Sequence, residues 1–152
     1  MQKLEVFGAK KLKGQVIISG SKNASLPILA ATLISKKKVI LKKLPKVKDI
    51  ETMIVLLESL GSRIKKFSNK IIINNKLQNK TFASYNLVKT MRAGILVLGP
   101  LLARFGKAKV SLPGGCAIGM RPVDIHLQAL SKLGVKYKII QGYVHATASK
   151  GL

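Results

Sequence analysis

Two stretches repeat one pattern in the two halves of the 152-residue chain: VKDIETMIVLLESLG at residues 47–61 and PVDIHLQALSKLG at residues 122–134. In each stretch an aspartate precedes apolar residues that recur at helical spacing, and a glycine follows the last of them. We expect Asp49 to cap the first of these helices, and Gly61 and Gly134 to end the two. The repetition predicts a chain made of two similar units.

The sequence around both predicted helices repeats as well. A nearly all-apolar helix and a short strand are predicted before each of them, and a two-stranded hairpin after it. In the first unit these elements are predicted at 23–34, 39–41, 63–67 and 70–74, and in the second at 90–103, 107–112, 135–140 and 143–147. Two opening strands are predicted at 3–7 and 12–19. The predicted fold class is α/β, with βαβαββ-like units at about 22–75 and 85–148.

The charge of the chain invites a nucleic-acid-binding interpretation, because 28 Lys plus Arg against 5 Asp plus Glu give a formal net charge of +23. Only four of these cations are arginines, however, and aromatic residues make up 5% of the chain, with no Trp. Base-edge contacts favour Arg, and single-strand stacking needs aromatic rings. A solvated, Lys-biased surface is therefore the favoured interpretation, and a basic module that binds nucleic acid or another anion is the alternative.

Composition also excludes several classes of protein. A single cysteine rules out a disulfide scaffold or a Cys-rich zinc site, and five acids leave little for carboxylate metal sites or glycosidase chemistry. No metal or cofactor is therefore expected. The hydrophobic content of 47% suffices for a core. We recognise no secretory segment and no apolar stretch long enough to span a membrane, so a cytoplasmic location is expected.

Two helix starts carry residues suited to anion binding. The segment SGSKN at 19–23 places a glycine turn and Lys22 at the beginning of an apolar helix, which suits an anion cradle but also an ordinary turn and cap. At the equivalent point of the second unit stands Arg92, one of the few arginines of the chain. Its planar guanidinium suits an anion, and a solvated charge is the alternative.

A third segment, LPGGCAIGMRPVD at 112–124, brackets the lone Cys116 with glycines and prolines between a predicted strand and a predicted helix. Nearby cations, such as Arg121, favour the thiolate, so this cysteine could act as an acid or a nucleophile, whereas a buried cysteine would be inert. His126 and His145 are isolated in the sequence and are expected to be surface or capping residues.

Three motifs, ISGSKNASLPIL at 18–29, YNLVKTMRAGILVLGPLLARFG at 85–106 and SLPGGCAIGMRPVDIH at 111–126, resemble the N-terminal portion of the UDP-N-acetylglucosamine enolpyruvyl transferases of peptidoglycan synthesis. The resemblance implies an inside-out α/β barrel of repeated βαβαββ units, here incomplete. It also implies a reaction, without a cofactor, in which the enolpyruvyl group of phosphoenolpyruvate is transferred to the 3′-hydroxyl of UDP-N-acetylglucosamine and phosphate is released.

The resemblance assigns roles to individual residues. Cys116 is implied to be the catalytic residue, which donates a proton and forms an adduct with phosphoenolpyruvate. Lys22 and Asn23 are implied to contact phosphoenolpyruvate and substrate, and Arg92 to hold the nucleotide sugar. The segment implied to line the UDP moiety is Arg121, Pro122, Val123, Asp124 and Ile125, of which Arg121 also faces phosphoenolpyruvate.

The chain departs from this family in length, because family members have two domains of three units each. We expect 1–21 to correspond to strands that pack with the second domain, and 22–152 to be an incomplete first domain. The second domain's general-base aspartate and its phosphate-gripping arginine are not found in this sequence. The chain is therefore expected to be inactive alone. It is interpreted as a fragment, as half of an enzyme completed by another chain, or as a decayed remnant.

Overall fold

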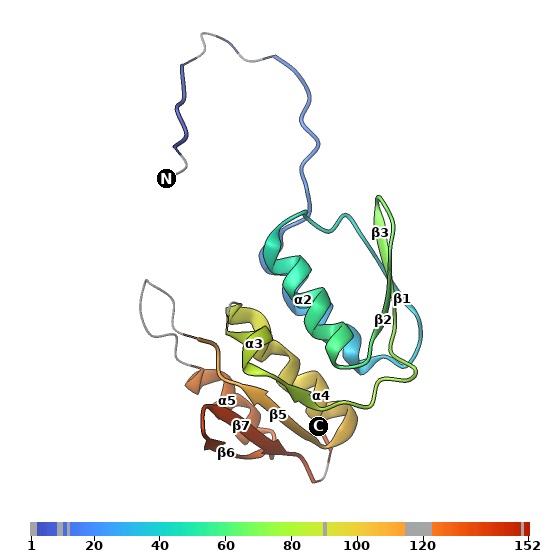
Figure 1. Ribbon diagram of the computed structural model, residues 1–152, viewed down its shortest axis with the longest axis vertical. Helices are drawn as coiled ribbons and strands as arrows, with labels where there is room; N and C mark the ends of the chain where they lie inside the picture. The colour runs from blue at the N-terminus through green and yellow to red at the C-terminus, as the bar shows by residue number, and fades with distance from the viewer. Residues whose placement is uncertain (1–2, 9–10, 12, 90, 115–122, 150) are drawn as a thin grey trace.

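The structure, a computed structural model, describes residues 3–8, 11, 13–89, 91–114, 123–149 and 151–152. The described residues before Lys22 form an extended segment that leads into two α/β units, each with its own sheet and helices (Figure 1). Both units follow the order predicted from the sequence repeat, so the α/β fold class is confirmed.

The opening segment contains no strand in its described residues, so the strands predicted at 3–7 and 12–19 are wrong for this structure. An extended backbone becomes a strand only when a neighbour pairs with its N–H and C=O groups. No described residue pairs with this segment. Its apolar side chains are consequently exposed, and Ile17 retains 92% of its accessible surface. The assignment of 1–21 to a separate packing partner stays a prediction.

The first unit agrees closely with the sequence pattern. Three antiparallel strands form its sheet in the order β1-β3-β2, and the β2–β3 hairpin turns where the sequence predicts. The helix α2 begins at Lys48 with Val47 as its N-cap, so the cap predicted at Asp49 is wrong. Asp49 lies in the first turn instead, where its negative charge interacts favourably with the positive end of the helix dipole. The elements are α1 (Lys22–Ala31), the 3-10 helix η1 (Thr32–Ile34), β1 (Val39–Lys42), α2 (Lys48–Ser59), β2 (Arg63–Lys66) and β3 (Lys70–Asn74).

The second unit contains a sheet in the order β4-β5-β7-β6, in which β4 is parallel to β5 and the other pairs are antiparallel. The short β4 was not predicted. The elements are β4 (Phe82–Ala83), α3 (Tyr85–Val88), the 3-10 helix η2 (Arg92–Val97), α4 (Leu98–Phe105), β5 (Lys107–Ser111), α5 (Asp124–Lys132), β6 (Lys136–Ile140) and β7 (Tyr143–Thr147).

The single helix predicted at 90–103 is instead divided into η2 and α4 in its described part. Pro100 has no N–H to donate to the carbonyl of Leu96, so a continuous α-helical ladder is interrupted there. Gly94 also packs tightly on α3, because a β-carbon at this position would lie 2.9 Å from Val88 Cγ1. The sequence pattern therefore predicted the apolar helical segment correctly, but it did not predict the division of that segment between Val97 and Leu98.

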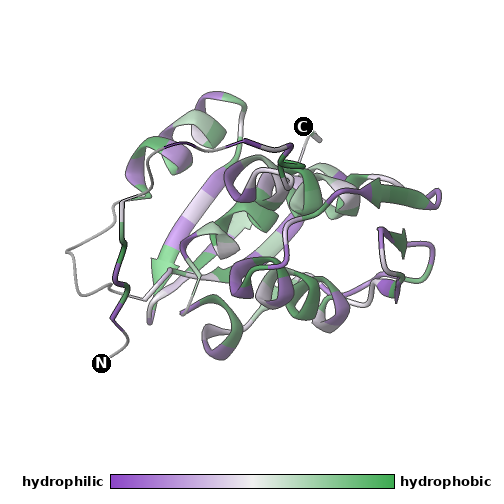
Figure 2. Ribbon diagram, turned by 90° about the horizontal axis from the view of Figure 1, so that it is seen from above, coloured by the Kyte–Doolittle hydropathy of each residue, from purple (hydrophilic) through white to green (hydrophobic). Residues whose placement is uncertain are grey.

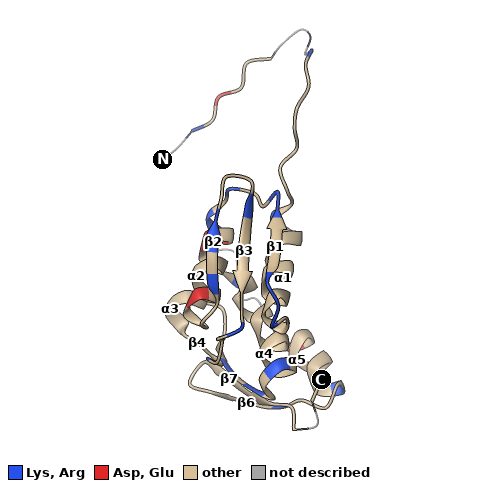
Figure 3. Cartoon of the chain, turned by 90° about the vertical axis from the view of Figure 1, so that its right-hand side faces the viewer, with Lys and Arg blue, Asp and Glu red and all other residues tan. Residues whose placement is uncertain are grey.

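The two units share one hydrophobic core, in which α1 packs on α2 and η2, and α4 packs on η1 and β5. Figure 2 shows hydrophobic stretches (green) on helices and strands throughout this packed body. Arg104 of α4 links the units, because its guanidinium donates to the carbonyl of Leu33 at 2.8 Å and to that of Asn75 at 2.6 Å. Lysines and arginines (blue in Figure 3) lie on strands of both sheets.

Candidate functional site

A cavity of about 530 Å³ lies where the first turns of α1 and α2 meet the beginning of η2. Its polar lining comes from Lys22, Asn23, Asp49 and Arg92. Apolar side chains of α1 and η2 form the remaining wall: Leu26, Pro27, Met91, Ala93, Ile95 and Leu96. The two helix starts predicted from the sequence to bind anions thus lie at one cavity.

The beginning of α1 is fixed by a close backbone contact. A β-carbon at Gly20 would lie 2.0 Å from the carbonyl oxygen of Lys43, so only glycine allows this approach. Ser21 then caps the helix, and its hydroxyl accepts from the N–H of Ala24 at 3.3 Å. Together these contacts place Lys22 beside the loop that leads into α2.

Lys22 and Asp49 form an ion pair across this cavity, with Lys22 Nζ donating to Asp49 Oδ2 at 3.1 Å. The two side chains are 49% and 39% exposed, so water screens the attraction and the pair orients the amine more than it stabilises the fold. The sequence analysis missed Asp49 as a site residue. The repeat could have indicated it, because Asp49 holds the position that Asp124 holds in the second unit.

Arg92 also lines this cavity and is an exposed residue. Its neighbours Met91 and Ile95 are buried, which anchors the first turn of η2 in the core while the guanidinium remains in solvent. In the described part of the chain the ion pairs are Lys3–Glu5 and Lys22–Asp49, so Arg92 has no carboxylate partner there. This guanidinium is therefore available to an anionic ligand.

Other predicted site residues lie elsewhere. Val123, Asp124 and Ile125 are at the start of α5 and do not line this cavity, and Ile125 is 77% exposed. Cys116, Arg121 and Pro122 lie outside the described residues. The structure therefore brings together Lys22, Asn23 and Arg92 from the predicted set and adds Asp49 to them.

The described beginning of the glycine-rich loop lies close to the segment that carries Arg92. A β-carbon at Gly114 would lie 2.8 Å from the carbonyl oxygen of Lys89, so the two backbones touch. Lys89 is the C-cap of α3 and stands three residues before Arg92 in the sequence. Gly114, the last described residue before Cys116, thus lies beside the end of α3.

The two histidines differ in their surroundings. His126 on α5 is partly buried, its Nε2 has no hydrogen-bond partner in the described structure, and burial lowers its pKa below the usual 6.5. The expected surface position is therefore met only in part for His126, which is neither fully exposed nor fully buried. His145 lies on β7, away from the cavity.

Within the described ranges, no three His, Cys, Asp or Glu residues gather in a way that could hold a metal ion. In the same residues, no helix is both long and apolar enough to cross a bilayer.

Comparison with protein families agrees with this architecture. Residues 6–151 match the family model described as EPSP synthase (3-phosphoshikimate 1-carboxyvinyltransferase), so the chain belongs to that family. The solved structure of the enolpyruvyl transferase NikO from Streptomyces tendae superposes with a TM-score of 0.77, covering 93% of this chain and 31% of that one. At 19% sequence identity, this likeness confirms the enolpyruvyl transferase fold alone.

Curated relatives of high sequence identity all carry one name within this family. The chain is 80% identical over all 152 residues to UDP-N-acetylglucosamine 1-carboxyvinyltransferase of Pelagibacter ubique (strain HTCC1062). It is 54% identical over 152 residues to the protein of the same name from Aliarcobacter butzleri (strain RM4018). In both comparisons the chain spans 36% of the relative's length. The recognition made from the three motifs is thereby confirmed.

Proposed function

We propose that this chain supplies one wall of the active site of a UDP-N-acetylglucosamine 1-carboxyvinyltransferase. Such an enzyme transfers the enolpyruvyl group of phosphoenolpyruvate to the sugar 3′-hydroxyl and releases phosphate. The observation that carries the proposal is the convergence of Lys22, Asn23 and Arg92, from equivalent helix starts in the two units, on one cavity. Both substrates are polyanions, and a cavity with an amine and a guanidinium suits them.

In this proposal Lys22 and Asn23 contact phosphoenolpyruvate and the nucleotide-sugar substrate, and Arg92 helps to hold the nucleotide sugar. The pairing of Lys22 with Asp49 holds the amine in the cavity until the ligand's anionic group takes the place of the carboxylate. Because both side chains of the pair are partly exposed, this exchange costs little.

The chemistry itself belongs to Cys116 in this proposal. Its thiol donates a proton to C3 of phosphoenolpyruvate while the sugar hydroxyl oxygen adds to C2, giving a tetrahedral ketal. Return of a C3 proton to the Cys116 thiolate and loss of phosphate then restore the double bond in the product. In the absence of the sugar hydroxyl, the thiol of Cys116 can instead add across the double bond, its proton going to C3 and its sulfur to C2, which forms the adduct. Arg121 faces phosphoenolpyruvate, and the segment of Pro122, Val123, Asp124 and Ile125 lines the UDP moiety.

The proposed setting is peptidoglycan synthesis in the cytoplasm, at its first committed step, and hence cell-wall biogenesis, cell shape, cell cycle and division. The base that deprotonates the sugar hydroxyl, an aspartate, and a second phosphate-binding arginine come from residues beyond those present here. They belong either to the same longer protein or to a complementing chain. The 152-residue chain alone is expected to bind ligands but to turn over little or no substrate.

Alkylation by fosfomycin, an epoxide phosphonate, tests this proposal, because the phosphonate needs the cations of the cavity and the epoxide needs a thiolate. Mass spectrometry is expected to find one adduct, on Cys116, which is the only cysteine. Lys22→Gln is expected to slow the labelling, whereas Lys37→Gln, an equal loss of charge at an exposed site, is not. No adduct in a folded chain, or equal rates in all three proteins, would refute the proposal.

A further inference from the structure

The outer face of the second sheet carries a cluster of amines. Strands β5, β7 and β6 are paired so that Lys107, Thr147 and Lys136 form one row across the sheet, and Lys109, His145 and Lys138 form the next row. Alternate residues of a strand point to opposite faces. Ala108 and Ala146, which lie between the two rows, are buried toward the helices, so the rows themselves face outward.

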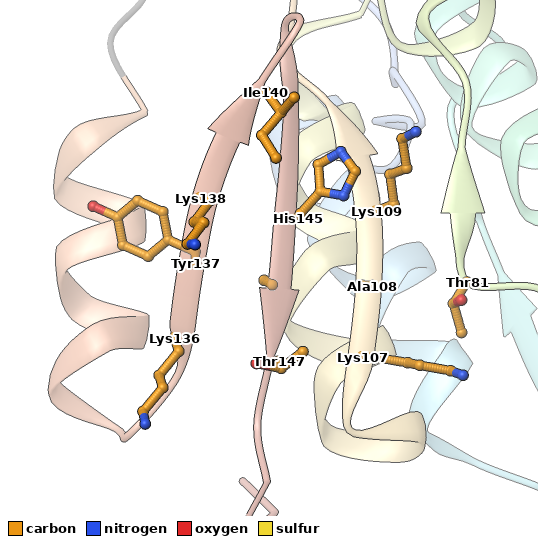
Figure 4. A pocket seen from close by; sticks show the side chains of 11 residues that line it. Thr81, Lys107, Ala108, Lys109, Lys136, Tyr137, Lys138, Ile140, His145 and Thr147 are labelled. Atoms are coloured by element: carbon orange, nitrogen blue, oxygen red, sulfur yellow. The ribbon is translucent and has the colours of Figure 1, made fainter.

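These rows surround a hollow of about 510 Å³ (Figure 4). Four lysines, a histidine and two threonines contribute to its lining: Lys107, Lys109, Lys136, Lys138, His145, Thr81 and Thr147. In the described part of the chain both ion pairs lie elsewhere, so none of these four amines has a carboxylate partner there. Like charges on neighbouring strands repel one another, and a bound anion would relieve that repulsion.

Two aromatic rings hold one of the amines in place. Lys109 Nζ lies 5.4 Å from the centroid of the Phe82 ring and 4.9 Å from that of Tyr143. The two ring centroids are 5.6 Å apart. Cation–π contacts of this kind attract the ammonium and restrict its motion. One side of the hollow is therefore fixed, while the exposed lysines of β6 on the other side can adjust to a ligand.

We propose that this face binds a compact polyphosphate anion. Residues two apart along a strand are separated by about 6.6 Å, and strands two apart by about 9.6 Å, so the four lysines enclose an area of roughly triphosphate size. The lysine ammoniums supply the charge, and the hydroxyls of Thr81 and Thr147 can donate further hydrogen bonds. A duplex would need a longer track of cations than two rows across three strands.

The proposed site is separate from the cavity of Lys22 and Arg92. Helix α4 packs against the opposite side of β5, so the sheet stands between the hollow and the helical layer (Figure 4). None of the residues lining the hollow lines the other cavity. Loss of either site is therefore expected to leave the other intact.

Calorimetric titration of the full 152-residue chain with inorganic tripolyphosphate, at constant ionic strength, tests the proposal. One-to-one binding is expected, and Lys109→Gln with Lys138→Gln should weaken it about tenfold, since two exposed charge contacts are lost. The matched control, Lys37→Gln with Lys65→Gln, removes the same charge from exposed positions of the first unit and should change affinity by less than about twofold.

Several results would overturn the proposal. Absence of saturable binding would do so, as would equal weakening by the two double variants, which would indicate general attraction to a cationic chain. Binding of duplex DNA or an acidic peptide, but not tripolyphosphate, with loss confined to the Lys109 and Lys138 variant would assign the face to a macromolecule instead. Circular dichroism of each variant shows whether it is folded as the parent is.

Discussion

Lys22 at the start of α1 and Asp49 in the first turn of α2 are joined by an ion pair of 3.1 Å, although 27 residues separate them in the sequence. The pair holds the amine of Lys22 at the cavity that Arg92 also lines. The carboxylate of Asp49 is thus bound to the same amine that an anionic ligand would contact. Ligand binding and the Lys22–Asp49 pair are therefore expected to compete.

Replacing Asp49 with Asn tests this competition. The variant removes the carboxylate but keeps the side-chain shape, so the rate at which dilute fosfomycin labels Cys116 is expected to rise about two- to fivefold, which corresponds to under about 1 kcal/mol. The measurement is the time course of labelling of both proteins, followed by mass spectrometry. Glu51→Gln removes the same charge from the same helical turn without touching the cavity, and it is expected to leave the labelling rate nearly unchanged. An equal increase in both variants would contradict competition at the ion pair.

Replacing Arg92 with Lys tests whether the planar guanidinium is needed. A charge-assisted contact to a diphosphate contributes about 1.5–3 kcal/mol, so affinity for UDP-N-acetylglucosamine is expected to fall at least about tenfold even though the charge is kept. Arg63→Lys on the exposed strand β2 is the matched control and should bind as the parent chain does. Undiminished affinity of the Arg92→Lys protein would show that any cation suffices.

Replacing Gly20 with Ala tests the contact that places α1. The added β-carbon would lie 2.0 Å from the carbonyl oxygen of Lys43, and relieving this overlap is expected to cost about 1–3 kcal/mol of unfolding free energy. Urea denaturation measures the change. Gly99→Ala is the control, since nothing lies near its added methyl group and a helical Gly-to-Ala change should stabilise by about 0.5–1 kcal/mol. Equal effects of the two substitutions would contradict the close approach.

His126 makes stability depend on pH. Burial lowers its folded-state pKa below 6.5, so protons bind more readily to the unfolded chain as the pH falls through that value. Stability is therefore expected to decrease from about pH 6.5 downward until the folded-state pKa is passed, and then to stop responding to this residue. Urea midpoints measured between about pH 7 and pH 5 should decline less in His126→Gln than in the parent chain. The same slope in both proteins would rule out His126 as the cause.

The sequence repeat predicted most of the fold, because apolar spacing and turn residues are local signals. Both hairpins and the start of the second amphipathic helix follow from them. The prediction of the opening strands was wrong because a strand forms only beside a neighbouring strand, and no described residue pairs with 3–8 or 13–19. The break between η2 and α4 was not predicted, although Pro100, which lacks a backbone N–H, was a sequence signal for it; the tight packing of Gly94 on Val88 is visible only in the structure.

Only part of the candidate site was predicted, because its local signals are visible in the sequence and its tertiary contacts are not. Lys22, Asn23 and Arg92 stand out because they begin apolar helices, and the repeat places those helices in equivalent positions. Asp49 was expected to act only within its own helix, because a sequence pattern does not show which side chain lies across a cavity. The lysines around His145 were interpreted as solvated surface, since their grouping depends on the strand register.

The most direct test of the central claim is a titration of the isotopically labelled chain with UDP-N-acetylglucosamine, followed by nuclear magnetic resonance. If α1 and η2 form one ligand site, saturable chemical-shift changes are expected at Lys22, Asn23, Arg92 and Ala93. A separate titration with tripolyphosphate is expected to change the chemical shifts of the cluster around His145 instead. Shifts confined to the face of β5, β6 and β7 with the nucleotide sugar, or no saturable shifts in the folded chain, would contradict the claim.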